Sequence, residues 1–152
     1  MLFQFLLGFF VSVINIMIHA LVTVGAVDVA RSAGLRPTRR PRWHLMLVMV
    51  GTAAALMVSH TLEVIVWALA DAIVGVAPAG GDPLYFAFVN YTTLGYGDIT
   101  PVQVWRLIGP MTAMNGILMF GWSTAVLFEV LRKTVEHLAS MGIPGLSYSD
   151  RG

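Results

Sequence analysis

Three long stretches of the sequence contain no charged residue, and this pattern limits what the chain can fold into more than any other feature. No Asp, Glu, Lys or Arg occurs in residues 1–27, 45–62 or 107–128. A helix needs about 20 mostly apolar residues to cross the hydrocarbon core of a bilayer. Each stretch is close to that length or longer, so we expect an all-α membrane protein with three transmembrane helices.

The composition supports a membrane protein. Of 152 residues, 57% are hydrophobic and 11% are charged, whereas soluble domains carry about 25% charged residues. The sequence shows no nucleotide-binding loop, no metal-ligand cluster and no nucleophile with its base. We therefore expect neither an enzyme nor a cofactor. No basic patch interleaved with aromatic residues is present, and we expect no nucleic-acid partner.

The first charge-free stretch is expected to stay in the protein as a transmembrane helix over residues 1–30. It has no basic residues at its start and no convincing cleavage site after it. Its apolar run also exceeds the ~7–15 residues of a secretory signal's apolar core. These features favour a retained helix over a signal peptide.

Residues 31–42 read RSAGLRPTRRPR and form a short basic connector. The prolines within it prevent one helix from running through. Basic loops remain on the cytoplasmic side, so we expect an outer amino terminus, a cytoplasmic connector and a cytoplasmic tail at residues 137–152. Topology alone accounts for the connector's arginines. The alternative is an interaction with anionic lipid headgroups through Arg31, Arg36, Arg39, Arg40 and Arg42.

An apolar segment too short to cross a bilayer lies within residues 43–136, between the second and third crossings. It reads PLYFAFVNYTT over residues 83–93, and this length is typical of a re-entrant helix. Asp82 is expected to cap the first free backbone amides, and Pro83 suits the first helical position.

The stretch TLGYGD follows this segment at residues 93–98. Irregular backbone at membrane depth is tolerated only where protein or a watery path surrounds it. Gly95 and Gly97 adopt positive φ angles without a Cβ penalty. That geometry would let Leu94 and Tyr96 point back into packing while the carbonyls of residues 93–96 face one axis, joined by the Thr93 hydroxyl. Such oxygens can replace the hydration shell of a monovalent cation.

These residues resemble the selectivity filter of the potassium channel superfamily, in which four TVGYG loops contribute rings of carbonyl oxygens. The resemblance extends over residues 82–133, from YFAFVNY before the filter to ITPVQVWRLIG after it. It implies a homotetrameric pore in the plasma (inner) membrane, with residues 43–136 as the pore domain. The permeant potassium ion would be held by a filter consisting of Thr93, Leu94, Gly95, Tyr96 and Gly97.

One filter position departs from the family pattern. Leu94 stands where Val or Ile is more common. A potassium-selective channel subunit remains the expected function. The alternatives are a weakly selective monovalent cation channel and a non-conducting accessory membrane protein with a relic pore.

The resemblance also implies supporting residues around the filter. Asp98 would brace its outer end against the pore helix, with the Tyr85 hydroxyl as donor, and Thr92 would support it from below. The alternative for Tyr85 is an interfacial anchor. Gly116 would mark a bend in the inner helix or a close-packing position, and Gly121 is favoured for packing.

Several polar residues lie within the expected crossings. Asn115 either faces a cavity or bonds a neighbouring helix. Glu63, with His60 one turn earlier, is a functional candidate because ionisable groups are costly in a membrane. The alternative is that Glu63 holds its helix to the first helix or to the pore helix. His19 and Asn15 are its available partners in the first helix.

Glu129 near the end of the third crossing also has two interpretations. It would form a ring of carboxylates at the inner mouth, or it would pair along the helix with Arg132 and Lys133. No crossing carries an arginine at every third position, so we expect no voltage-sensor helix.

The basic connector leads to a testable topology. The chain contains no cysteine, so single cysteines placed in residues 31–42 would be labelled without background. A membrane-impermeant thiol reagent should reach them only from the cytoplasmic face, because basic loops stay on that side. Labelling of these cysteines from the outer face of intact cells would contradict this topology.

Overall fold

The computed structural model describes residues 1–34 and 40–140, in which four helices and one short 3-10 turn follow one another. The elements are α1 (Leu2–Gly34), α2 (Pro41–Val74), α3 (Pro83–Tyr91), η1 (Gln103–Trp105) and α4 (Ile108–Ser140). Helices α1, α2 and α4 are long and apolar enough to cross a membrane. The expected all-α membrane fold is therefore confirmed.

The helix ends follow local sequence signals. Pro41 lies in the first turn of α2, where a missing amide hydrogen costs nothing, and α2 ends at Gly75 in the left-handed conformation with φ 67°. The Asp82 carboxylate accepts hydrogen bonds from the amides of Leu84 and Tyr85, which confirms the expected cap of α3.

Two helices run further than the sequence suggests. Helix α1 passes residue 30 and places Arg31 in its last turn, and α4 passes residue 136 to end at Ser140. Arg36, Arg39 and the tail beyond residue 140 lie outside the described residues, so the structure says nothing of them.

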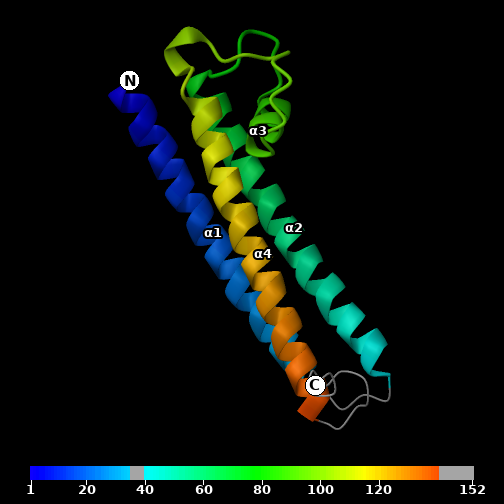
Figure 1. Cartoon of the computed structure of the whole chain (residues 1–152). Coiled ribbons are helices and arrows are strands. Elements are labelled where there is room, and N and C mark those ends of the chain that lie inside the picture. Colours follow the sequence, from blue (N-terminus) through cyan, green and yellow to red (C-terminus); the bar gives the residue numbers. More distant parts are fainter. Residues whose placement is uncertain (35–39, 141–152) are drawn as a thin grey trace, which may run out of the picture.

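The three long helices lie side by side, and α3 packs against α2 and α4 at one end of the bundle (Figure 1). The amino terminus lies at this same end. There the Gln4 side chain accepts a hydrogen bond from the Leu107 amide at 3.1 Å, and the rings of Phe3 and Trp105 are 5.6 Å apart. The end of α1 and the start of α2 lie at the opposite end, which agrees with the relative arrangement expected from the connector.

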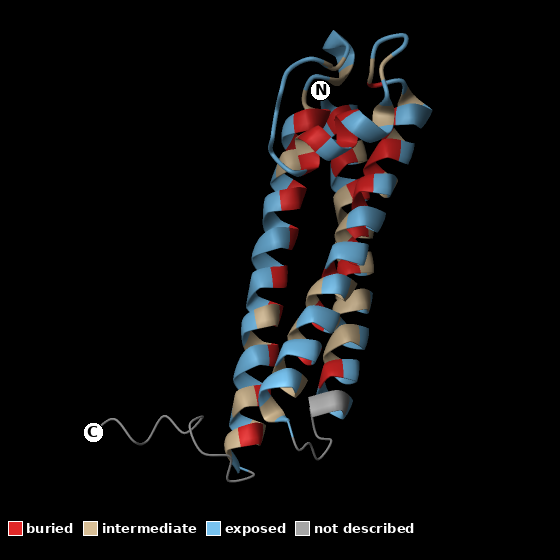
Figure 2. Ribbon diagram, turned by 90° about the vertical axis from the view of Figure 1, so that its right-hand side faces the viewer, coloured by how far each residue is buried: buried red, intermediate tan, exposed pale blue. Residues whose placement is uncertain are grey.

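The buried residues form a narrow strip between the helices, and much of the remaining surface is exposed (Figure 2). One apolar cluster surrounds α3 and includes Trp67 and Phe86. A second lies towards the other end of the bundle and includes Leu56 and Val126. Polar residues such as Glu63 are fully buried as well.

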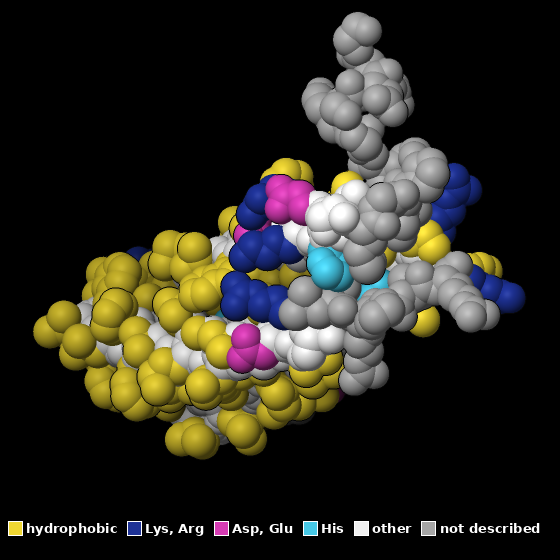
Figure 3. Space-filling model, turned by 90° about the horizontal axis from the view of Figure 1, so that it is seen from below, with side chains coloured by type: hydrophobic (Ala, Val, Ile, Leu, Met, Phe, Trp, Pro, Cys, Tyr) yellow, Lys and Arg dark blue, Asp and Glu magenta, His cyan; other side chains and the backbone are white. Residues whose placement is uncertain are grey.

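The outer surface is suited to lipid. Phe9, Ile73 and Phe128 are 67%, 82% and 66% exposed in the single chain. Seen from the end opposite α3, Lys and Arg side chains gather at that end while hydrophobic side chains cover the flank (Figure 3). Apolar flanks with charges at an end are the distribution expected of a protein that crosses a bilayer.

Helix α4 packs closely against the end of α3 at Gly116. A Cβ atom there would collide with the Tyr91 carbonyl oxygen, whereas a Cβ at Gly121 would meet no atom within 4 Å in the single chain. Gly116 is therefore a close-packing position, while a bend there stays a prediction. Gly121 has no packing partner within the single chain, so its expected packing also stays a prediction.

Alanine at these two glycines should have opposite effects on stability. Gly116→Ala forces the Tyr91 backbone to move, and overpacking of this kind costs about 1–3 kcal/mol. Gly121→Ala removes a helix-destabilising glycine and should stabilise α4 by up to ~1 kcal/mol. Thermal unfolding of the purified protein in detergent measures both, and a Gly116→Ala protein as stable as Gly121→Ala would contradict the packing described here.

Candidate functional site

The loop after α3 turns back along the helix that precedes it. Helix α3 ends at Tyr91, and the chain then runs through residues 92–98. At the far end of this loop the Asp98 carboxylate accepts a hydrogen bond of 2.7 Å from the Tyr85 hydroxyl, in the first turn of α3. The chain thus descends through α3 and returns beside it, which is a re-entrant path.

The backbone of this loop alternates in handedness. Thr93, Gly95 and Gly97 have φ angles of 61°, 57° and 75°, whereas Leu94 and Tyr96 have negative φ. The two glycines take this conformation without penalty. Thr93 is β-branched, and a left-handed residue of this type is strained by about 1–2 kcal/mol. The sequence reasoning predicted positive φ at the glycines but not at Thr93.

Two amides of the loop point towards α3. The N–H groups of Leu94 and Gly95 both donate to the Val89 carbonyl oxygen, at 2.9 and 3.2 Å. A trans peptide is planar, and its C=O points opposite to its N–H. The carbonyls that share peptides with these amides, those of Thr93 and Leu94, therefore both face away from α3. Successive carbonyls on one side provide the oxygen ligands that a bare cation requires.

The loop is exposed in the single chain. All residues from Thr92 to Asp98 are exposed, with Leu94 at 54% and Tyr96 at 67%. The expected packing behind Leu94 and Tyr96 is thus not supplied by this chain alone. Irregular backbone that faces lipid costs several kcal/mol for each unpaired group, so in a membrane this loop must face protein or water rather than lipid.

The expected hydrogen bond between Tyr85 and Asp98 is present. Asp98 also accepts from the Ile99 amide at 3.0 Å. The Tyr85 hydroxyl lowers the pKa of the Asp98 carboxyl below its ordinary value, and the same bond raises the pKa of Tyr85. At the other end of the loop, the Thr92 hydroxyl donates to the Phe88 carbonyl at 2.8 Å and so secures the last turn of α3.

Asn115 bonds within the helix bundle. Its side-chain oxygen accepts from the Trp67 indole and from the Asn15 amide, each at 3.0 Å, and Asn115 is 3% exposed. Of the two interpretations from the sequence, the structure shows the bond to neighbouring helices, because three helices enclose Asn115. Trp67 as a partner was not foreseen, since nothing in the sequence sets it apart from other apolar positions of α2.

Glu129 lies in a pair on the surface of α4. Its carboxylate bonds Arg132 at 2.8 Å and Lys133 at 2.9 Å. Both contacts run along one helix, as the second interpretation from the sequence expected.

Glu63 holds three helices together. Its carboxylate contacts His19 of α1 at 2.8 Å and accepts from Ser59 at 2.8 Å. It also accepts a hydrogen bond from the Tyr91 hydroxyl at the end of α3. The sequence left open whether His19 or Asn15 is the partner of Glu63. His19 bonds the carboxylate, and Asn15 donates to the Glu63 backbone carbonyl at 3.2 Å.

A multi-pass membrane bundle with a short helix that enters from one end is an arrangement found in ion channels. The chain belongs to the ion channel family, because the model of that family matches residues 44–133. The matched domain is of the two-helix potassium channel type. This is a family of channels and not of enzymes. No curated protein and no solved structure matches the chain.

Removal of the Tyr85 hydroxyl should raise the pKa of Asp98. The bond lowers the pKa of Asp98. Its contribution to the stability of the folded protein is therefore present at pH values above the ordinary carboxyl pKa and is lost as pH falls through the lowered pKa. In Tyr85→Phe the carboxyl should titrate at higher pH, as followed by NMR of labelled aspartate. In Asp98→Ala, Tyr85→Phe should cause little further loss of thermal stability. An unchanged Asp98 titration in Tyr85→Phe would contradict the brace.

Proposed function

We propose that the chain is a potassium-selective channel subunit that conducts potassium ions passively through a homotetrameric pore. The observation that carries this proposal is the alternating backbone of Thr93–Gly97, with two of its amides turned towards α3. The Thr93, Leu94, Gly95 and Tyr96 carbonyls, with the Thr93 hydroxyl, would replace the water around a potassium ion.

The tetramer follows from the number of loops needed to surround an ion. One chain supplies one carbonyl-bearing loop, and the potassium channel filter uses four. The exposure of residues 92–98 in the single chain also favours assembly, because neighbouring copies would cover the loop and its exposed Leu94 and Tyr96 side chains.

Helix α3 would contribute electrostatically. It ends at Tyr91, whose hydroxyl reaches Glu63 within α2, so the carboxyl end of α3 points into the bundle. The carboxyl end of a helix carries partial negative charge. Four such ends around an axis would favour a cation below the filter.

A weakly selective cation channel is the second candidate. Leu94 is half-exposed in the single chain, so the packing that holds its carbonyl in place would depend on a neighbouring copy. Leu is not branched at Cβ as Val and Ile are, and this difference in shape would loosen the carbonyl ring and with it the preference for potassium over sodium.

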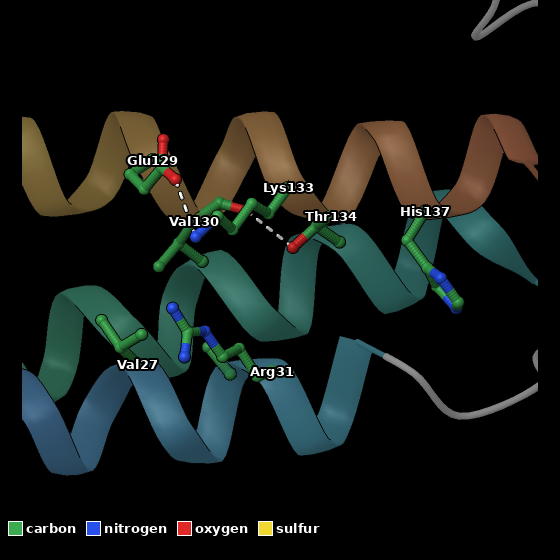
Figure 4. Close-up of a pocket in the computed structure, with 8 residues that line it drawn as sticks. Val27, Arg31, Glu129, Val130, Lys133, Thr134 and His137 are labelled. Atoms are coloured by element: carbon green, nitrogen blue, oxygen red, sulfur yellow. Dashed lines mark hydrogen bonds and ion pairs between the residues drawn. The ribbon is translucent and has the colours of Figure 1, made fainter.

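An anionic lipid is a proposed partner at the end opposite α3. A groove of about 270 Å³ lies between α1 and α4, and Arg31 and Lys133 are among the residues that line it (Figure 4). Arg40 and Arg42 lie near the start of α2 and are also exposed. We place this basic end in the cytoplasm and the amino terminus outside, in line with the positive-inside rule.

Gly95→Ala should abolish conduction or the preference for potassium over sodium. Gly95 has a φ of 57°, and an L-residue in that conformation costs about 1–2 kcal/mol. Four chains repeat the strain around one axis. Single-channel recording in lipid, with reversal potentials in mixed potassium and sodium, measures both properties.

Gly51→Ala is the matched control, because a Cβ at Gly51 in α2 would meet no atom within 4 Å. It should leave selectivity unchanged. Mass measurement of the detergent-solubilised protein should return four chains for the wild type and both variants, because the transmembrane helices do not depend on the loop. Unaltered reversal potentials and conductance in Gly95→Ala would rule out the loop as the filter, and a monomer as the only conducting species would rule out the tetramer.

A further inference from the structure

A buried cluster of two imidazoles and one carboxylate lies where α1, α2 and α3 meet. His19 and Glu63 have no exposed side-chain surface, and the His60 side chain is 14% exposed. The sequence alone showed no metal-ligand cluster, because His19 lies 44 positions from Glu63. Only the packing of α1 on α2 brings these groups together.

The ring nitrogens of both histidines converge on the carboxylate. His19 Nδ1 lies 2.8 Å from Glu63 Oε1, and His60 Nδ1 lies 3.6 Å from Glu63 Oε2. The ligand atoms of the three side chains all lie within 4.8 Å of one another. Two imidazoles and one carboxylate are a donor set that zinc uses in proteins.

A fourth donor comes from α3. The Tyr91 hydroxyl lies 2.9 Å from His60 Nδ1 and also bonds the Glu63 carboxylate. The cluster thus offers four oxygen and nitrogen donors from three helices. Around a tetrahedral ion with bonds of ~2.0–2.2 Å, neighbouring ligand atoms are ~3.3–3.6 Å apart. His60 Nδ1 and Glu63 Oε2 already have this spacing at 3.6 Å, and the hydrogen-bonded pairs of the cluster must move apart to admit an ion.

The second nitrogen of each imidazole also has a partner. His60 Nε2 lies 2.9 Å and His19 Nε2 lies 3.4 Å from the hydroxyl of Ser123 in α4. Histidines that bind metals use their other ring nitrogen for a hydrogen bond that fixes the ring. Here one hydroxyl orients both rings with Nδ1 directed at the carboxylate.

The charge of an ionised Glu63 carboxylate also favours a bound cation. Within residues 1–34 and 40–140, its ion-pair partners are His19 and His60 alone. An ionised carboxylate buried at membrane depth requires a compensating positive charge. A proton on a histidine supplies one charge, and a divalent metal ion supplies two.

We propose that His19, His60, Glu63 and Tyr91 form a binding site for a divalent transition-metal ion of the zinc class. Binding of the ion displaces protons from these groups, because metal ligands bind in their deprotonated forms. It ties α3 directly to α1 and α2. Ser123 acts as a positioning residue for both imidazoles.

Metal titration of the purified full-length protein tests this site without measuring channel activity. After treatment with a chelator, we expect the wild type to bind one Co²⁺ per chain with the visible absorption of a tetrahedral complex. Zn²⁺ should displace the Co²⁺ and raise the thermal unfolding temperature.

Variants separate this site from other histidines. Loss of a ligand in His60→Gln should weaken affinity by more than the ~10–100-fold expected for Ser123→Ala, which removes only the outer hydrogen bonds. His44→Gln is the matched control, since His44 is outside the cluster, and it should keep wild-type affinity. Circular dichroism establishes that each variant is folded. No saturable Co²⁺ binding by the wild type, or equal affinity in wild type and folded His60→Gln, overturns the proposal.

Discussion

A backbone surrounded by lipid must satisfy its own hydrogen bonds, and the architecture of this chain follows from that constraint. The long helices meet it internally. The loop after α3 meets it in part, through amides that share the Val89 carbonyl, while the carbonyls of Thr93 and Leu94 turn away from α3. The packing of α3 against α2 and α4 fixes where this loop begins, and its exposed backbone requires protein or water around it. The proposed pore uses the carbonyl oxygens of this loop, which are not part of a helix and so are free of helical hydrogen bonds.

Features encoded in short windows were predictable from the sequence. The crossings follow from runs of uncharged residues, the start of α3 from Asp82 and Pro83, and the brace between Tyr85 and Asp98 from a family resemblance. Features that depend on how one helix is rotated against another were not. Gly116 and Gly121 look alike in the sequence, and only the face that α4 turns to α3 distinguishes them. The partner of Glu63 was undecided for the same reason.

Tyr91 connects the two parts of the structure. Its hydroxyl bonds Glu63 and His60 in the buried polar cluster, and its carbonyl lies against Gly116 of α4. The next residues along the chain form the loop with alternating handedness. Buried polar contacts specify one register between helices more sharply than apolar contacts do, because a mismatch leaves a charged or polar group unpaired. The start of the loop is thus held by polar contacts with α2 and by close packing against α4.

The part of the chain shared with the ion channel family begins at residue 44, after α1. The cooperative unit is larger than that. Helix α1 supplies His19 to Glu63 and Asn15 to Asn115, so a two-helix domain cut out along the family boundary would leave a carboxylate and an amide without those partners in an apolar solvent. Helix α1 is therefore an integral part of the packed bundle. Exchange of this helix between relatives would succeed only if the matching residues of α2 and α4 were exchanged with it.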